Sequence, residues 1–378
     1  MTARERICGA MRGEEVTPLP CAIYFNVNLR VDGFDCSTLE GRTALAVELG
    51  TDPFVPMGMG VSLHPDVRVS TWAEESPGTN EPILWQAWDT PEGRLTQAIK
   101  QGSACRDWTS IRWCDEAASS LHEPLIKEHA DIARCRYLLQ PLTEADYSRW
   151  LAAQRRTFAF AEDRGLPVVL TYGQGLAKLI FMMGAERSVL FALDDPQGFE
   201  RLAEMIHQCE MRNIELAGRG QVDILKRFGG YEMCNFYNPD IFTKVCLPRL
   251  KAEVEFAHAQ GLLIYYRIVT GMEPLLDTIA DIGFDCIEGG EPCLSQCSLE
   301  TWHAAFRGKA ASWTGISTPV LLGGNDPEAV RREVRRCADV FGRKGFILGV
   351  TNSIRNHFPW DNTLTMVDEW KRIRSGHP

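Results

Sequence analysis

The stretch from Gly261 to Pro292, GLLIYYRIVTGMEPLLDTIADIGFDCIEGGEP, decides the fold. A strand-like apolar run ends on Tyr265, Tyr266 and Arg267, a segment with helical character follows, and a second apolar run ends on Glu288. A strand, a helix and a second strand in this order are the repeating unit of a parallel sheet.

The same unit returns along the chain. Short apolar runs that end in Gly, Asn, Asp or Glu read as strands at 20–27, 166–173, 222–230, 262–269, 285–292, 319–326 and 345–352. Helical segments lie between most of them, such as 238–261 and 326–345, each opened by Asn-Pro or Asp-Pro and closed by Gly. About eight strands in one chain favour a closed (β/α)8 TIM-type barrel over an open sheet, with residues 1–378 forming a single domain.

One segment breaks this rhythm. Residues 60–139 are rich in turn residues and tryptophans, which are Trp72, Trp85, Trp88, Trp108 and Trp113. We expect this insertion to form arms or a lid over the barrel mouth rather than an independent domain.

Composition restricts the function. The chain has 378 residues, 45% hydrophobic and 24% charged, with a net charge of −10, which fits a soluble globular protein and argues against nucleic acid as a partner. No apolar run approaches the roughly 20 residues of a membrane helix, and the first residues lack the apolar core of a secretion signal, so we expect a cytoplasmic protein. Thirteen cysteines scattered through a long chain indicate reduced, buried thiols.

Polar residues collect where the predicted strands end. In a barrel such side chains point into a shared mouth, where the chemistry takes place. The candidates chosen on this ground are Asn26, Tyr172, Lys226, Arg227, Tyr265, Tyr266, Arg267, Glu288, Asn325 and Asn352. His357 follows the last strand and has a pKa range that suits proton transfer.

Six segments in order resemble the uroporphyrinogen decarboxylase superfamily, which contains the porphyrinogen decarboxylase and many corrinoid-linked methyltransferases. They lie at 4–24, 184–206, 238–261, 274–292, 321–337 and 345–362 and together cover nearly the whole chain. The resemblance implies a barrel and leads us to expect a homodimer.

Departures from the family patterns restrict which branch of the superfamily the chain resembles. The decarboxylase carries an arginine-rich signature near its start and a histidine after its last strand, whereas this chain has only Arg30 in 24–34 and Asn352 near the histidine position. Uroporphyrinogen, with eight carboxylates, needs many cations and is therefore an improbable substrate.

A second departure concerns zinc. Zinc-dependent methyltransferases of the superfamily use a His-x-Cys pair after one strand and a Cys after the last, but 265–271 and 349–354 hold neither residue type. We therefore expect no metal of this kind. Cys234, Cys293 and Cys297 remain as a weak metal signal.

The remaining branch resembles components that pass a methyl group from a small, methoxylated aromatic molecule to a corrinoid protein, on the segments 64–72, 88–102 and 122–139. In that chemistry the protein must protonate the departing oxygen. We assign Tyr266 or Tyr265 as the proton donor, Glu288 as the group that orients it, and Arg267 with Lys226 as an anion clamp. Since neighbours on a strand face opposite sides, only one of the two tyrosines can face the lumen.

Two other hypotheses stay open. The first is a decarboxylase or other lyase that acts on a small aromatic acid. The second is a non-catalytic member that binds a small molecule. Fold alone does not choose among the three, because barrels host many chemistries.

Overall fold

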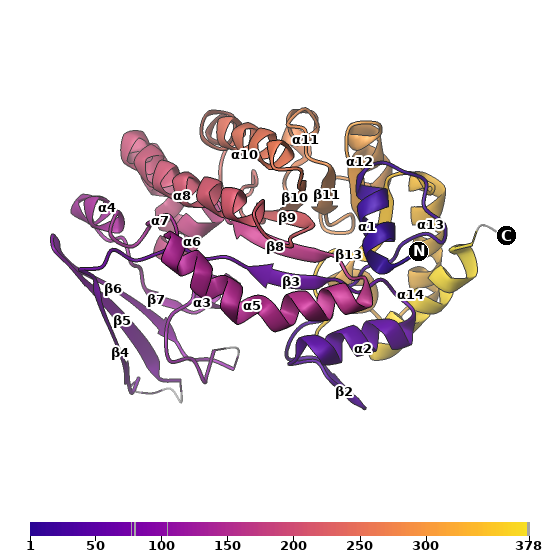
Figure 1. Ribbon diagram of the computed structural model, residues 1–378, viewed down its shortest axis with the longest axis horizontal. Helices are drawn as coiled ribbons and strands as arrows, with labels where there is room; N and C mark the ends of the chain where they lie inside the picture. Colours follow the sequence, from indigo (N-terminus) through magenta and orange to yellow (C-terminus); the bar gives the residue numbers. More distant parts are fainter. Residues whose placement is uncertain (77, 79–80, 104, 376–378) are drawn as a thin grey trace.

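A parallel sheet closed into a TIM-type barrel forms the body of the protein, as the sequence predicted (Figure 1). The computed structural model describes residues 1–76, 78, 81–103 and 105–375. Seven parallel strands lie side by side in the order β13–β12–β11–β10–β9–β8–β3. They are β3 (Val55–Gly58), β8 (Val168–Gly173), β9 (Ile224–Phe228), β10 (Leu263–Ile268), β11 (Cys286–Gly289), β12 (Ala311–Ile316) and β13 (Phe346–Val350).

The segment 20–26 closes the ring between β13 and β3. Cys21 forms a parallel bridge with Leu348, and Phe25 forms one with Ile354. On the other side, the Asp52 amide donates to the Cys21 carbonyl over 2.7 Å, and the Asp52 carboxylate accepts from the Cys21 amide over 2.8 Å. The predicted first strand is therefore present as a bridging segment.

One predicted strand was wrong. Residues 319–326 contain a π-helix, Thr318–Leu322, because Ser317 caps its first turn and Pro319 fits there without a free amide. The seventh barrel strand is instead β12, which carries Ser312, Trp313 and Thr314 and lacks an obvious apolar run. The short β3 was also missed in the sequence.

Helices surround the barrel, as Figure 1 shows. They are α1 (Ala3–Met11), α2 (Leu39–Leu49), α5 (Glu144–Arg164), α6 (Leu176–Met183), α7 (Ala185–Asp194), α8 (Pro196–Ala217), α9 (Pro239–Ile241), a π-helix at Phe242–Cys246, α10 (Leu247–Ala259), a 3-10 turn at Glu273–Leu275, α11 (Leu276–Ala280), α12 (Leu299–Phe306), α13 (Pro327–Phe341) and α14 (Trp360–Ile373). The predicted caps are present: Asn238 accepts from the Ile241 amide and Asp326 from the Ala329 amide. None of the described helices is long and apolar enough to cross a membrane.

The insertion forms a four-stranded antiparallel sheet in the order β4–β5–β6–β7. Its elements are β4 (Arg68–Glu74), β5 (Ile83–Thr90), β6 (Gly93–Lys100), α3 (Asp115–Ser119), β7 (Leu121–Glu123) and α4 (His129–Cys135), and a small hairpin, β1 (Arg30–Val31) with β2 (Phe34–Asp35), precedes it. Gln97 donates to the Phe181 carbonyl, and the Trp113 carbonyl accepts from Gln174, which follows β8. These bonds hold the insertion at the C-terminal end of β8.

The barrel interior is a small core of its own. Phe54, Tyr265 and Trp313 pack in the lumen, and Ile7 and Met11 of α1 pack against the same cluster. Helix α1 therefore fills the N-terminal end of the barrel. Both termini lie at the end of the molecule opposite the antiparallel sheet (Figure 1).

Removing the Asp52 carboxylate tests the closure of the barrel. Arg6 pairs with Asp52 over 2.6 Å, so Asp52→Ala leaves both this arginine and the buried Cys21 amide without their partner. We expect the free energy of unfolding to fall by about 1–3 kcal/mol. Urea denaturation measures it, with Glu48→Ala on the exposed side of α2 as the control, expected to change stability by less than about 0.5 kcal/mol. Equal losses in the two variants would contradict the closure role.

Candidate active site at the barrel mouth

Strand register decides which side chains enter the lumen. Lys226 on β9 is level with Tyr265 on β10, and Arg267 is level with Glu288 on β11. Residues in register across parallel strands point to the same side, and alternate residues of one strand do so too. Tyr265 belongs to the inner core, so Lys226, Arg267 and Glu288 also point inward.

The neighbouring residues point the other way. Tyr266 is level with Arg227, one residue further along each strand, and packs in the outer core between strands and helices. Its hydroxyl donates to Glu232 over 2.8 Å, and its ring stacks on Phe284. The expected pairing of Tyr266 with Glu288 in the lumen is therefore not present, because alternation puts Tyr265 there instead. Arg227 and Tyr172 also lie outside the lumen, contrary to expectation.

The lumen residues form one polar cluster. The hydroxyls of Tyr24 and Tyr265 are 2.6 Å apart, and the Lys226 ammonium lies 3.4 Å from the Tyr24 hydroxyl and 4.6 Å from the centre of its ring. Arg267 forms an ion pair with Glu288 and donates to the Thr351 carbonyl. Lys226, Arg267 and Glu288, contributed by three successive strands, thus meet around Tyr24.

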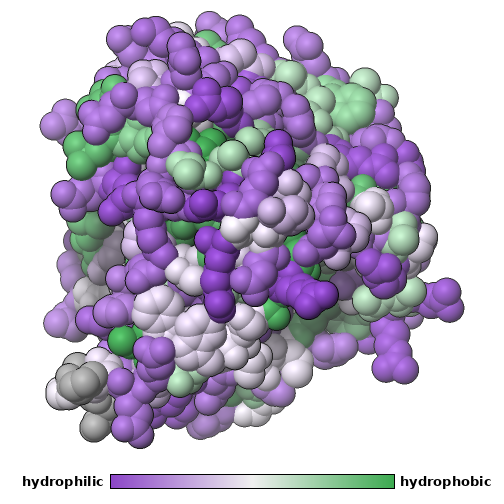
Figure 2. All heavy atoms as spheres, turned by 90° about the vertical axis from the view of Figure 1, so that its left-hand side faces the viewer, coloured by the Kyte–Doolittle hydropathy of each residue, from purple (hydrophilic) through white to green (hydrophobic). Residues whose placement is uncertain are grey.

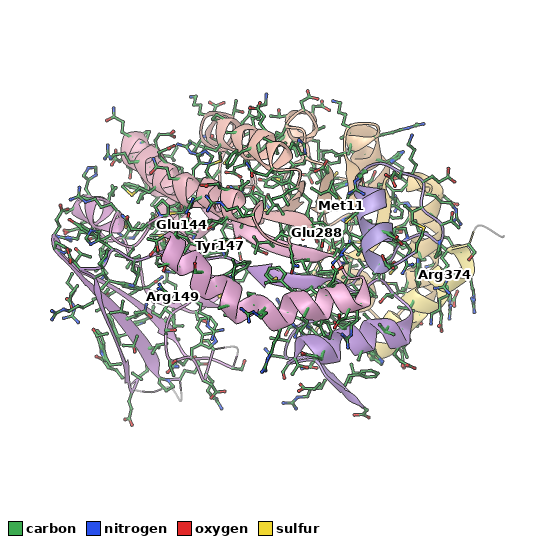
Figure 3. The ribbon with its side chains drawn as sticks, viewed as in Figure 1. Met11, Glu144, Tyr147, Arg149, Glu288 and Arg374 are labelled. Atoms are coloured by element: carbon green, nitrogen blue, oxygen red, sulfur yellow. The ribbon has the colours of Figure 1, made fainter. Side chains whose placement is uncertain are left out.

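Glu288 has an unused oxygen. Its side chain is 1% exposed and lies among the barrel strands (Figure 3). Oε1 accepts from Arg267, whereas Oε2 has no hydrogen-bond partner among the residues that the structure describes. A buried carboxylate oxygen without a donor is costly, so this atom is a natural contact for a ligand.

Burial sets the protonation of the cluster. It lowers the pKa of Lys226 to about 8, although Glu288 acts in the opposite direction. Burial also raises the pKa of the Tyr24 and Tyr265 phenols, with the Glu288 charge adding to the effect. Near neutral pH the phenols therefore stay protonated hydrogen-bond donors, and Lys226 is the group whose proton is most easily given up.

A cleft of about 1030 Å³ lies at the mouth. Its lining comes from the segment before α2, the insertion, the loop after β9 and the loop after β13, and includes Asn26, Arg30, Asp115, Tyr231, Asn352 and Arg355. Burial raises the pKa of Asp115, while Tyr231, Arg267 and Arg355 act to lower it. The charge of Asp115 also acts to raise the pKa of Lys226. Asp115 therefore links the cleft with the lumen cluster electrostatically.

The other predicted residues are distributed as follows. Asn26 and Asn352 line the cleft. Asn325 and His357 are exposed, His357 against the ring of Phe358, and the structure does not bring them to the lumen cluster. Asp115 of the insertion was not predicted from the sequence as a site residue.

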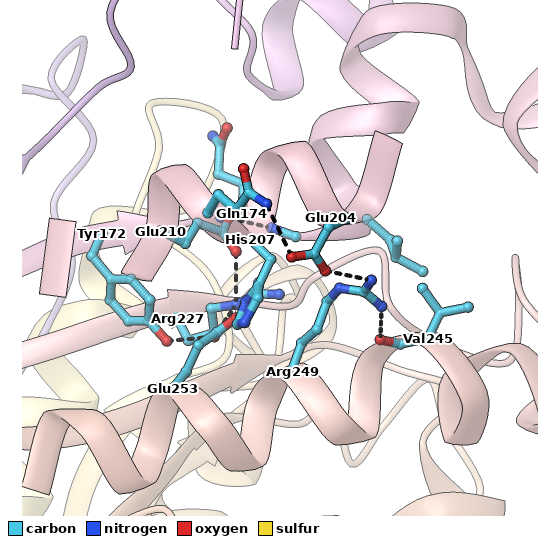
Figure 4. Close-up of polar contacts among 12 residues, drawn as sticks. Tyr172, Gln174, Glu204, His207, Glu210, Arg227, Val245, Arg249 and Glu253 are labelled. Carbon is cyan, nitrogen blue, oxygen red and sulfur yellow. Dashed lines mark hydrogen bonds and ion pairs between the residues drawn. The ribbon is translucent and has the colours of Figure 1, made fainter. Parts of the chain in front are cut away.

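A second polar cluster lies behind β9, in the outer core (Figure 4). The Arg227 guanidinium donates to Glu232 and to Glu253, each over 2.9 Å, and lies 3.8 Å from Glu210. Tyr172 and His207 also bond to Glu253. This group of buried charges supports the mouth from outside.

The same carboxylates anchor the loop that follows β8. Glu210 accepts from the Gln174 and Gly175 amides over 2.7 and 2.8 Å, and Glu232 accepts from the Leu176 amide over 2.8 Å. The backbone after β8 is thereby fixed where it meets the insertion.

The donor sets decide how well a metal fits. Over the described part of the chain, His207, Glu210 and Glu253 are the one group of His, Cys, Asp and Glu residues with metal-ligand spacing, and Arg227 already supplies their cation. In the lumen, Lys226 and Arg267 are cations themselves. A thiol-activating zinc needs His and Cys ligands, so the lumen residues do not fit it.

Comparisons with known proteins agree with the fold. The family model described as uroporphyrinogen decarboxylase (URO-D) matches residues 110–373. No curated protein matches. A solved structure of a methyltransferase from Methanosarcina mazei is 15% identical, with a TM-score of 0.57 over 98% of this chain and 99% of that chain, and therefore has the same fold. A B12-independent methionine synthase from Shewanella sp. W3-18-1 is 11% identical over 58% of this chain and 64% of its own, with a TM-score of only 0.43.

Arginine removal tests the outer cluster. Arg227→Met leaves three buried carboxylates without their shared cation, and we expect it to lower the free energy of unfolding by about 3–5 kcal/mol. Arg249→Met is the matched control, since Arg249 pairs with the half-exposed Glu200 and Glu204 and its loss should cost about 1 kcal/mol or less. Denaturant unfolding at one pH compares them. Similar losses of unfolding free energy in the two variants would show that the buried cluster contributes no more to stability than a surface ion pair.

Proposed function

The chain belongs to the uroporphyrinogen decarboxylase family, and from that premise we propose that it is a methyltransferase that moves a methyl group from a small methoxylated molecule to a corrinoid on a partner protein. The observation that carries the proposal is the buried lumen cluster of Lys226, Arg267 and Glu288 beneath a mouth cleft. The shared fold with a methyltransferase over nearly the whole of both chains is consistent with it.

The charges of the site favour a small substrate. Lys226 and Arg267 point into the lumen, and Arg30 and Arg355 line the cleft together with the acidic Asp115. A site of mixed charge suits a ligand with one developing anion better than a molecule with eight carboxylates.

Transfer from oxygen makes a specific demand on the protein. The acceptor, a nucleophile, attacks the methyl carbon, the carbon–oxygen bond breaks, and its electron pair remains on the departing oxygen. That oxygen needs a proton or a nearby cation in the transition state. Lys226, with its pKa of about 8, gives the proton, Tyr24 orients the ammonium, and Arg267 stabilises the negative charge that develops on the oxygen before the proton is transferred. The product is then a neutral hydroxyl, and Lys226 is left as a neutral amine.

The free Oε2 of Glu288 selects among substrates. A ligand that carries a hydroxyl or amino group beside the methoxy group satisfies this oxygen, whereas a ligand without a donor leaves it unpaired. Tyr231 lines the cleft and packs edge to face against Phe181 and Phe228, which gives an aromatic wall. We therefore propose a hydroxylated or aminated methoxyaromatic compound as substrate.

The corrinoid is the methyl acceptor carried by a separate protein, and zinc takes no part in the step. The methyl transfer takes place in the cytoplasm, and the insertion serves as the lid of the site.

Two neighbouring tyrosines provide a matched test. Tyr265→Phe removes the hydrogen bond that positions Tyr24, and we expect turnover to fall roughly 10–10²-fold. Tyr266→Phe removes a bond to Glu232 outside the lumen and should leave turnover near normal while lowering stability by about 1–3 kcal/mol. The assay follows methyl transfer from 2-methoxyphenol to a reduced corrinoid protein. A larger turnover loss in Tyr266→Phe would reverse the assignment.

Two further measurements separate the alternatives. Carbon dioxide released from an aromatic acid without any acceptor would identify a decarboxylase. A ligand that raises the melting temperature without turnover would identify a binding protein.

The pH dependence tests Lys226 directly. Because the acid form is required, turnover should be full below pH about 8 and fall as the pH rises through that value, where the ammonium is lost. Lys226→Arg keeps its charge, so this decline should disappear or move to much higher pH. Lys226→Met should be roughly 10²-fold slower than the parent below pH 8, with no decline of its own through that value, so the difference from the parent should shrink as the pH rises. Rates measured from pH 6 to 10 provide the comparison. The same decline in Lys226→Arg would assign it to another group.

A further inference from the structure

Strand β4 has an open edge. It is the terminal strand of the antiparallel sheet, and among the described residues its backbone pairs with β5 alone. Six of its seven residues are exposed, including Val69 at 45%. In Figure 1 it lies at the outer margin of the insertion, away from the barrel. An open edge of this length is a template for another strand.

The sequence of β4, RVSTWAE, lacks the usual protection of an edge. It contains no proline and no lysine, and its charges stand only at the two ends, Arg68 and Glu74. The five residues between them are uncharged and include Val69, Thr71 and Trp72, which favour extended structure. The sequence of this edge strand therefore favours pairing with another strand and lacks the residues that usually prevent it.

Its charges match in one antiparallel arrangement. We propose that two copies of this chain pair through β4, with Thr71 of each copy at the two-fold axis, so that the two sheets join into one. Arg68 then lies opposite Glu74 of the second copy at both ends, and Val69 lies opposite Ala73. A two-fold axis perpendicular to the sheet requires this kind of symmetric register, and shifting it by one step loses the Arg–Glu match.

The tryptophans add an apolar centre to the same interface. Trp72 stacks on Trp85 of β5 with 5.8 Å between ring centres, and its indole donates to Glu74 over 2.8 Å. Symmetric pairing sets Ser70 of the second copy opposite Trp72 and brings the two Trp72 rings to diagonal positions on one face. Each Trp72 ring is half-buried in one chain, and contact with the second copy would cover it further. The side of the molecule that carries the insertion is largely hydrophilic (Figure 2).

Charge reversal tests the pairing. Arg68→Glu puts two carboxylates opposite each other at both ends, and Glu74→Arg does the same with two cations. Each single variant should weaken dimerisation about ten-fold or more, and Arg68→Glu combined with Glu74→Arg should restore it. Sedimentation equilibrium over a concentration series gives the dissociation constants. Arg155→Glu on the exposed face of α5 is the control for the same charge change and should leave dimerisation unaltered.

Crosslinking tests the register. Under mild oxidation Thr71→Cys should form a dimer linked by a disulfide, whereas Val69→Cys alone should not, and a mixture of Val69→Cys with Ala73→Cys should. The parent chain gives the background from the exposed Cys293. The proposal is overturned if the parent stays monomeric at every concentration, if Arg68→Glu dimerises as the parent does, or if the double variant fails to recover. None of these outcomes depends on methyl transfer.

Discussion

The arginine buried among three carboxylates is the interaction on which the mouth of the barrel depends. Arg227 joins β9 to α8 through Glu210, to α10 through Glu253 and to the loop after its own strand through Glu232. Because an unpaired buried charge is far more costly than a paired one, none of these elements can move away alone. The same carboxylates hold the amides of the loop after β8, so backbone positions at the mouth follow from a charge outside it.

Alternation along two strands separates structure from chemistry. Lys226 and Tyr265 face the lumen, and their immediate neighbours Arg227 and Tyr266 face the helices. Each strand thus contributes one residue to a rigid network and the neighbouring one to the lumen cluster, in which Oε2 of Glu288 has no partner in the described part of the chain. The side that faces the helices keeps its partners fixed, whereas the lumen side retains a carboxylate oxygen that has no partner among the described residues.

The barrel was predictable because its units repeat, and most of the lumen candidates followed from the positions of strand ends. Which of Tyr265 and Tyr266 faces the lumen could not be predicted, because two adjacent aromatic residues in a fully buried strand show no alternation of polar and apolar side chains. β12 escaped notice because a strand buried on both sides tolerates Ser312 and Thr314 when they find partners. Asp115 comes from an insertion without periodicity, so its place depends on packing that appears only in three dimensions.

Helix α1 closes the N-terminal end of the barrel. With Ile7 and Met11 packed there among the described residues, the route to Lys226 lies through the mouth at the opposite end. Under the proposed function, a small donor and a large acceptor protein then share one route, which imposes an order of events. The donor enters first, the acceptor closes the opening behind it, and the demethylated product waits inside until the acceptor leaves. Turnover of such a site is limited by binding and release through one opening as much as by cleavage of the carbon–oxygen bond.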